Sequence, residues 1–426
     1  MSATARPADA QAAPALDGRA HASGETGTQP VVVVGIGADG WAGLGERARA
    51  ALAQAERIVG SERQLALLPA LRGSLRAWPS PLDPLVDELV ANGGCVLASG
   101  DPMLHGIGAT LARRVPAGRL VVHPHPSAFS LACARLGWPA ADVALVSAVG
   151  RPAQALVRVL QPRRRVVVYA SGAGAADEVA RLLCERGFGA SRFVVLEQLG
   201  GERERAIEAS ARSWGERAVD PLHAIAIECA SDPDARPLAL VPGLRDDAYE
   251  HDGQLTKRHV RAITLAALAP MPGALLWDVG AGSGSIGIEW LRAEPSARAI
   301  AVERDAERAQ RARANALALG TPALEVVLGR APEALCELPG PDAVFVGGGL
   351  TSPGVVERCW YALRPGGRIV ANAVTLEGER LLVNAREHCG GELVRIEISH
   401  AEPLGSFQAW RAQLPVLQWS ARKAPA

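Results

Sequence analysis

Three segments in the second half of the chain carry glycines and carboxylates at a spacing that suits a nucleotide-containing ligand. Asp278 precedes the loop Gly280-Ala281-Gly282-Ser283-Gly284, which follows an apolar, strand-like run. Glycines let a backbone approach a ligand closely and tolerate a positive φ. Glu303 ends the next apolar run, where its carboxylate can accept hydrogen bonds from both hydroxyls of a ribose. Gly329-Arg330-Ala331 ends a third run, next to where an adenine would lie.

Two cofactors fit this pattern. The spacing Gly282-x-Gly284-x-x-Gly287 also satisfies the dinucleotide fingerprint, so a nicotinamide-dependent oxidoreductase remains an alternative. Asp278 can address the ammonium group of a bound amino acid, and this favours S-adenosylmethionine. The carboxyl ends of parallel strands meet in one crevice, so the three segments are expected to converge there.

The first half has a weaker pattern of the same kind. The run Val31-Val-Val-Val34 ends in Gly35-Ile36-Gly37, and a second apolar run ends in Ser99-Gly100-Asp101-Pro102. By itself such a loop can be a simple turn. His105 follows it and is a candidate for facing a pocket.

Other chemistries find little support. His123-Pro-His125 lacks a third ligand, so no metal site is expected, and no convincing Ser-His-Asp or Cys-His arrangement is present. The 7 cysteines form no Cys-x-x-Cys pair, which predicts buried thiols in a reducing cytoplasm. Lys plus Arg and Asp plus Glu both number 45, which gives no support for nucleic-acid binding. No apolar run is long enough to predict a membrane span.

Alternating strands and helices predict an α/β protein with two domains. Residues 1–30 read as a disordered tail, and the polar linker 231–237 separates a domain at 31–236 from one at 237–426. In the first domain we expect a helix over about 44–59 and a last strand at 223–228. In the second, five strands alternate with helices. Two further strands, 392–399 and 408–418, form an antiparallel pair, a pattern typical of a Rossmann-like seven-stranded class I methyltransferase.

The second half resembles the decarboxylating, carbon-15-methylating domain of the precorrin-6Y C5,15-methyltransferase family of cobalamin biosynthesis. The resemblance covers nearly all of residues 240–420. The matching segments are Gly243–Lys257 with its Asp-Gly-x-x-Thr-Lys end, Leu276–Ser285, Gly329–Glu333, Asp342–Gly349 with Phe-Val-Gly-Gly-Gly, and Arg364–Val374.

The first half is similar to the class III tetrapyrrole methylase domain fused to it in that family. The shared motifs are Val34-Gly-Ile-Gly37, Ser99-Gly-Asp-Pro-Met103 and Leu196–Glu202. Where many relatives have a Pro-Gly pair, this chain has Ala38-Asp39-Gly40-Trp41, and Gly60–Gln64 replaces a Gly-x-Arg-His segment. The second departure puts a basic substrate contact there in doubt.

The resemblance implies methylation of a corrin precursor at carbons 5 and 15 and decarboxylation of the ring C acetate, with one S-adenosylmethionine per domain. Alternatives are a non-catalytic tetrapyrrole-binding subunit and a cobalt-containing substrate. A homo-oligomer is expected. In the first half the cofactor would contact Gly35, Gly37, Gly100, Asp101 and Pro102. In the second half it would contact Thr256, Asp278, Gly280, Ala281, Gly282, Gly284, Glu303, Gly329, Arg330 and Ala331. Candidate substrate contacts are His105, Lys257 and Arg258, with Arg330 also placed to dock a carboxylate.

Overall fold

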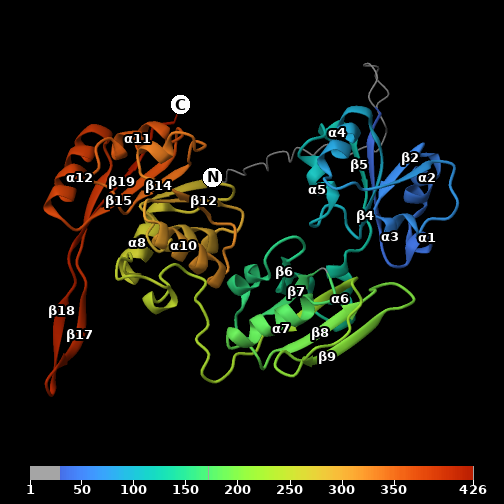
Figure 1. The fold of residues 1–426 in the computed structure, drawn as a ribbon, viewed down its shortest axis with the longest axis horizontal. Coiled ribbons are helices and arrows are strands. Elements are labelled where there is room, and N and C mark those ends of the chain that lie inside the picture. Colours follow the sequence, from blue (N-terminus) through green and yellow to red (C-terminus); the bar gives the residue numbers. More distant parts are fainter. Residues whose placement is uncertain (1–28, 171, 426) are drawn as a thin grey trace, which may run out of the picture. The chain divides into compact units, whose positions relative to one another are not determined.

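The computed structural model describes residues 29–170 and 172–425, so the predicted tail lies almost wholly outside the described residues (Figure 1). The chain forms two compact units, one of residues up to 36 with 40–125 and the other of 37–39 with 126–426. The linker at 231–237 forms neither helix nor strand and lies inside the second unit. The domain boundary at 236 therefore stays a prediction. In the described residues, no helix is both long and apolar enough to cross a membrane.

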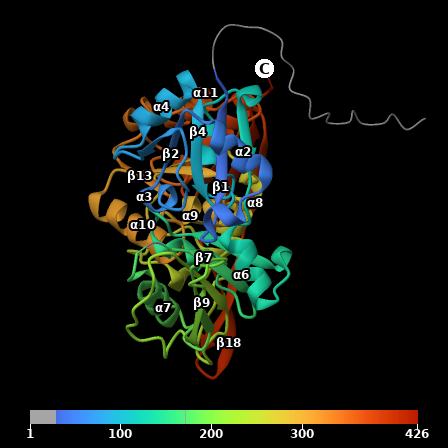
Figure 2. The same ribbon diagram turned by 90° about the vertical axis from the view of Figure 1, so that its right-hand side faces the viewer.

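The first unit is a parallel five-stranded sheet in the order β3-β2-β4-β1-β5. Both views show β1 beside β4 (Figures 1 and 2). Alternate residues of β1 point to opposite faces, so Val31 and Val33 join one apolar cluster and Val34 and Ile36 another. The strands are β1 Val31–Ile36, β2 Arg57–Gly60, β3 Ser74–Ala77, β4 Gly94–Ser99 and β5 Leu120–His123. The helices are α1 Gly40–Gly43, α2 Glu46–Gln54, α3 Glu62–Leu65, α4 Asp83–Asn92, α5 Ile107–Ala112 and the 3-10 turn η1 Ala117–Arg119.

The helix predicted over 44–59 is wrong in its last third. Helix α2 ends at Gln54, and Arg57–Gly60 forms strand β2 between β3 and β4. Ile58 and Val59 are fully buried on opposite faces of the sheet. Tertiary packing therefore overrode a local pattern that suits either element.

The second unit begins with a mixed five-stranded sheet in the order β6-β7-β10-β8-β9. Its strands are β6 Val143–Ser147, β7 Arg165–Tyr169, β8 Arg192–Glu197, β9 Arg205–Ser210 and β10 His223–Glu228, and the last is where the sequence predicts it. Its helices are α6 Ala128–Leu136 and α7 Ala175–Glu185, with the 3-10 segments η2 Ala140–Asp142 and η3 Ala153–Val159.

The remaining residues of this unit build a seven-stranded sheet in the order β13-β12-β11-β14-β15-β19-β16, with β19 antiparallel to both neighbours. This confirms the predicted class I methyltransferase topology. The strands are β11 Leu275–Val279, β12 Arg298–Glu303, β13 Glu325–Leu328, β14 Ala343–Val346, β15 Arg368–Ala373, β16 Glu392–Ile396 and β19 Val416–Arg422. The helices are α8 Arg258–Leu268, α9 Ser285–Ala293, α10 Ala306–Ala318, α11 Val355–Ala362 and α12 Leu376–Cys389, with 3-10 turns η4 Asp246–Ala248 and η5 Glu333–Leu335.

The strand predicted at 408–418 is in fact divided between two sheets. Residues Ser399–Leu404 (β17) and Phe407–Ala412 (β18) form a separate hairpin that projects from the large sheet, and β19 begins at Val416 (Figure 1). The sequence pattern identified extended structure but not the change of partner.

Candidate functional site

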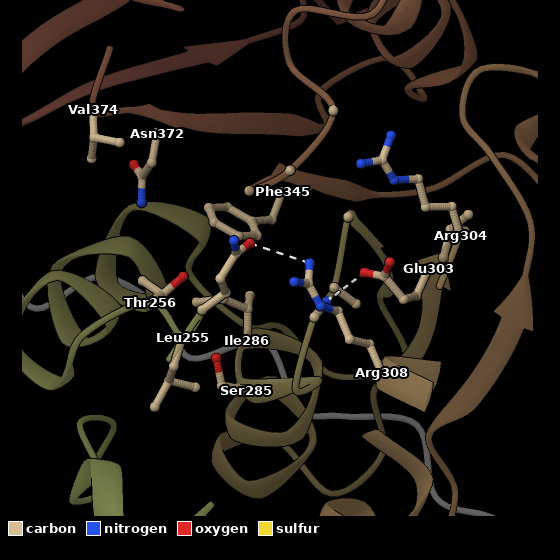
Figure 3. A pocket seen from close by; sticks show the side chains of 18 of the residues that line it. Leu255, Thr256, Ser285, Ile286, Glu303, Arg304, Arg308, Phe345, Asn372 and Val374 are labelled. Atoms are coloured by element: carbon tan, nitrogen blue, oxygen red, sulfur yellow. Dashed lines mark hydrogen bonds between the residues drawn. The ribbon is translucent and has the colours of Figure 1, made fainter. Parts of the chain in front are cut away.

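A cavity of about 900 Å³ lies at the carboxyl ends of strands β11 to β15 (Figure 3). It is the place that open α/β sheets use for ligands, and its size falls in the range of small-molecule sites. The lining residues are Gly253, Gln254, Leu255, Thr256, Lys257, Val260, Gly280, Ala281, Gly282, Ser285, Ile286, Val302, Glu303, Arg304, Arg308, Gly329, Arg330, Ala331, Phe345, Gly347, Gly348, Gly349, Thr351, Ser352, Asn372, Val374, Gln413, Leu414 and Val416.

The glycine loop forms one wall of this cavity, and its conformation requires glycine. Gly280, Gly282 and Gly284 have φ values of +69°, +58° and +76°. A Cβ on Gly280 would lie 2.4 Å from the Cα of Gly348, in the loop after β14. The loops after β11 and β14 therefore touch through their backbones, and a side chain at Gly280 would force them apart.

Glu303 ends β12 and is held in place by the loops around it. One carboxylate oxygen accepts a hydrogen bond from the backbone N–H of Gly282 at 2.8 Å, and the other accepts one from Asp305 at 3.0 Å. The residue is 5% exposed and lines the cavity. Because each oxygen has a second lone pair, the carboxylate can still accept two hydrogen bonds from a ligand.

Asp278 lies behind the glycine loop and is not among the cavity-lining residues. It is 1% exposed, and one carboxylate oxygen accepts a hydrogen bond from the N–H of Gly287 at 2.9 Å. The other oxygen is buried with no hydrogen-bond partner. Burial, with a smaller contribution from the charge of Glu303, raises the pKa of this carboxyl to about 7, although the hydrogen bond from Gly287 acts to lower it. A contact between Asp278 and a bound ammonium group stays a prediction.

The segment carrying Thr256 and Lys257 is held by a buried ion pair between α8 and α9. Arg261 is fully buried and donates to Glu289, 1% exposed, at 2.6 Å. Arg261 also donates to the carbonyl oxygen of Thr256, and Glu289 accepts from the hydroxyl of Tyr249 at 2.9 Å. Because every one of these groups is paired, the network holds Thr256 rigidly at the cavity wall.

The residues just before Thr256 are also held by a side chain of α10. Arg308 donates to Asp252 at 2.7 Å and to the side-chain oxygen of Gln254 at 3.2 Å. Arg258, predicted to contact substrate, donates to the carbonyl oxygen of Gly243 at 2.9 Å and is not among the lining residues. Its predicted role stays untested, whereas Lys257 and Arg330 do line the cavity.

Comparison with known proteins agrees with this geometry. Residues 247–423 match the model of the precorrin methyltransferase domain, and residues 30–213 match that of the tetrapyrrole (corrin/porphyrin) methylases. A precorrin-6Y C(5,15)-methyltransferase (decarboxylating) of Sinorhizobium sp is 48% identical over 92% of this chain and 95% of its own length. The chain belongs to the precorrin-6Y C(5,15)-methyltransferase family.

Two further relatives extend the comparison. A Mycobacterium tuberculosis protein of the same name is 46% identical over 92% of this chain and 100% of its own length. A crystal structure of the C-terminal domain of the Rhodobacter capsulatus precorrin-6Y C5,15-methyltransferase is 50% identical, covers 44% of this chain and all of that domain, and has a TM-score of 0.42. As a family member, this chain is a decarboxylating methyltransferase of cobalamin biosynthesis.

In the tetrapyrrole methylase region, the end of β1 and the predicted loop after β4 lie in close backbone contact. A Cβ on Gly35 would lie 2.1 Å from the carbonyl oxygen of Gly100, whose own φ is +59°. Asp101 accepts from the N–H of Met103 at 2.8 Å, and Pro102 is buried. The motif therefore builds a rigid turn at the carboxyl edge of this sheet.

Two other predicted residues of this region lie near the same loops. Gly37 directly follows β1, and His105 is exposed with a φ of +59°. Contacts of Gly35, Gly37, Gly100, Asp101, Pro102 and His105 with a ligand stay predictions. Among the described residues, no group of three or more His, Cys, Asp or Glu side chains is arranged to hold a metal ion.

Three residues that line the cavity of this precorrin methyltransferase domain were not predicted as site residues from the sequence. Arg304 follows Glu303 directly, and Arg308 lies in the first turn of α10. Asn372 lies near the end of β15, inside a segment that carried the family resemblance. A polar residue at the carboxyl end of a predicted strand was the available signal for Asn372, since that edge forms the site in α/β sheets.

Proposed function

We propose that each half of the chain binds one S-adenosylmethionine, and that the cavity of the 237–426 half carries out methylation at carbon 15 together with decarboxylation. The observation that carries this proposal is Glu303, a buried carboxylate that two backbone N–H groups aim along the cavity wall. The fixed carboxylate beside a glycine loop matches the donors and acceptors of a ribose and a methionine backbone.

The residues present fit this cofactor. The close backbone approach at Gly280 leaves no room for side chains, and the remaining acceptor capacity of Glu303 suits a diol. Thr256, Gly280–Gly282, Gly284 and Glu303 would hold the methionine and ribose portions, and Gly329, Arg330 and Ala331 the adenine. When bound, the cofactor supplies an electrophilic methyl group on a sulfonium. The protein then contributes alignment and exclusion of water, and it needs no nucleophilic residue of its own.

Neither rival function gains support. The comparisons favour a methyltransferase and not a nicotinamide-dependent oxidoreductase. A non-catalytic tetrapyrrole-binding subunit would be favoured by a blocked cofactor pocket, but the glycine loop of the second half opens onto a cavity of about 900 Å³. For the first half, we assign carbon-5 methylation to the region around Gly35, Gly37 and Gly100–Pro102, with His105 as a candidate substrate contact.

A cofactor titration tests the two-site proposal. We expect the full chain to bind two S-adenosylmethionine molecules in calorimetry. Glu303→Ala should weaken one site by about 1–3 kcal/mol, the cost of leaving buried hydroxyls unpaired. Asp101→Ala should weaken the other, and Glu303→Gln, which keeps an acceptor, serves as the matched control. A single S-adenosylmethionine site in the unmodified chain, or an unchanged affinity for S-adenosylmethionine in Glu303→Ala, would contradict the proposal.

We also propose that the chain forms a homo-oligomer through the β17–β18 hairpin. A lone two-stranded hairpin is marginally stable in water, and exposed apolar patches mark interaction sites. Leu404, Phe407 and Trp410 on this hairpin are 66%, 76% and 78% exposed. Light scattering should find more than one chain per particle, and Phe407→Ser with Trp410→Ser should reduce it to one. A monomeric unmodified chain would contradict the proposal.

We place the enzyme in the reducing cytoplasm. All seven cysteines are unpaired, but Cys184 and Cys336 are exposed, so the prediction of buried thiols is wrong for these two. Burial raises the pKa of Cys95, Cys229 and Cys359 to about 12. Free thiols of this kind suit a compartment that keeps cysteines reduced.

A further inference from the structure

Charged side chains are unevenly distributed around the cavity of the second half. Glu303, Arg304 and Arg308 come from β12 and α10, on one side of the glycine loop, and Figure 3 shows them grouped together. Arg330 follows β13, the next strand outward on that side. Lys257 is exposed at the start of α8. These cations suit the carboxylates that the macrocyclic substrate keeps.

The opposite side is formed by the segments after β14 and β15 and before β19, and α8, which begins after Lys257, packs behind them through Val260 and Thr264. Figure 3 shows Asn372 and Val374 there, well separated from Arg304 and Arg308. None of the lining residues from these segments carries a formal charge. They are Gly347, Gly348, Gly349, Thr351, Ser352, Asn372, Val374, Gln413, Leu414 and Val416.

The amide of Asn372 is held in one orientation on this uncharged side. Its Nδ2 donates to the hydroxyl of Thr264 at 3.0 Å, and its Oδ1 accepts from Nε2 of Gln418 at 3.0 Å. Gln418 also donates to Thr264 at 3.1 Å, and the two supporting residues are 3% and 0% exposed. One N–H of Asn372 is left over, so the side chain can still donate to a ligand.

The physical chemistry of decarboxylation favours such surroundings. A carboxylate that loses carbon dioxide starts with a localised charge and reaches a transition state with that charge spread into the departing electron system. A cation beside the carboxylate stabilises the start more than the transition state and slows the reaction. An uncharged wall withholds that stabilisation, while a single amide donor can still orient the group.

We propose that the acetate arm that is decarboxylated binds on this uncharged side, with the free N–H of Asn372 donating to its carboxylate and Val374, Leu414 and Val416 forming its apolar wall. The proposal rests on the function assigned above. In the step, the bond between the acetate methylene and its carboxyl carbon breaks and carbon dioxide leaves. The freed electron pair passes through the conjugated ring to carbon 15, which forms a bond to the methyl group while the methyl–sulfur bond breaks. Anion and sulfonium give neutral products, so the step needs no other reactant.

Placing a cation on the uncharged side tests this assignment. Val374 is 53% exposed, so Val374→Lys should fold normally. We expect it to bind the macrocycle more tightly, measured by absorbance titration without cofactor, and to release carbon dioxide about 10-fold more slowly or worse, since 1.36 kcal/mol of ground-state stabilisation is worth a factor of ten. Affinity for S-adenosylmethionine should stay within about 2-fold, a difference well under 1 kcal/mol.

Two matched variants separate the effect of a charge inside the cavity from the effects of a larger side chain and of an added charge elsewhere. Val374→Met has similar length without the charge, and it should release carbon dioxide several-fold faster than Val374→Lys does. Leu376→Lys adds the same charge at a site that is 80% exposed and outside the cavity lining, and it should change nothing. If Val374→Lys releases carbon dioxide as fast as Leu376→Lys does, the acetate lies elsewhere and the inference is overturned.

A negative charge at the same place should weaken binding of the macrocycle, which is the reverse of the effect on binding expected for Val374→Lys. Asn372→Asp can still accept from Thr264 and Gln418, so the network survives, but the new anion should raise the KM for the macrocycle by about 10-fold or more through like-charge repulsion. Lys257→Met should raise KM without changing the maximal rate of carbon dioxide release. A faster maximal rate in Lys257→Met would place the acetate against that lysine and contradict the assignment. An unmodified enzyme that releases no carbon dioxide would refute the proposed function instead.

Discussion

Gly280→Ala is expected to abolish methylation at carbon 15 and decarboxylation together while leaving methylation at carbon 5 intact. The alanine Cβ would lie 2.4 Å from the Cα and 2.5 Å from the carbonyl oxygen of Gly348. These are backbone atoms that cannot move aside as a flexible side chain can. The φ of +69° adds strain on the order of 1 kcal/mol for a residue with a Cβ.

The readout is the mass of the product. A single methylation with the acetate retained is the expected result, and calorimetry should show one cofactor site weakened by about 10-fold or more. Gly405→Ala is the matched control, because Gly405 also has a positive φ of +63° but has nothing within 4 Å of an added Cβ. Equal loss of both methylations in Gly280→Ala would favour a single shared site over two.

Asp278→Asn is expected to stabilise the second half at neutral pH. In the folded chain the pKa of Asp278 is about 7, whereas an unperturbed aspartate titrates near 3.8. The folded state therefore keeps a proton that the unfolded state gives up between these values. This group does not reduce the free energy of unfolding below about pH 4. The free energy of unfolding then declines as the pH rises from about 4 to about 7. The neutral asparagine avoids this loss, which is on the order of 4 kcal/mol for a shift of about three units.

The measurement is urea unfolding of both proteins from pH 5 to pH 8. The stability advantage of Asp278→Asn should grow with pH across this interval and level off above about pH 7. A variant less stable than the unmodified chain at pH 8 would show that the ionised carboxylate is satisfied in the fold. Cofactor titration of the same variant separates the two roles: lowered affinity supports the predicted ammonium contact, and unchanged affinity marks Asp278 as a support of the glycine loop.

The sequence predicted the parts of the second site that depend on backbone geometry. Positive φ at Gly280 and Gly282 needs glycine, and Glu303 had to end the strand beside that loop, so residue types alone indicated their positions. The parallel order of β11 to β15 followed from alternating strands and helices. The same kind of reasoning recovered the turn at Gly100–Pro102.

The sequence did not determine features that depend on distant partners. Residues 57–59 read as helix but belong to strand β2, because pairing with β3 and β4 decides the conformation of a short apolar run. The burial of Asp278 and its raised pKa depend on the packing of α9 against β11. The placement of Arg308 over the cavity depends on an ion pair with Asp252, which lies 56 residues earlier in the chain.

The distribution of charge around the cavity was also decided by the tertiary structure. Asn372 on β15, Thr264 on α8 and Gln418 on β19 meet only because the sheet places β19 next to β15 and α8 against both. Short segments of sequence carry information over a few residues. They were enough to predict the glycine turns and strand ends of this chain and to recognise its family motifs. Hydrogen bonds between residues 46 to 154 positions apart carry no local signal, and they oriented the amide that faces the uncharged side of the cavity.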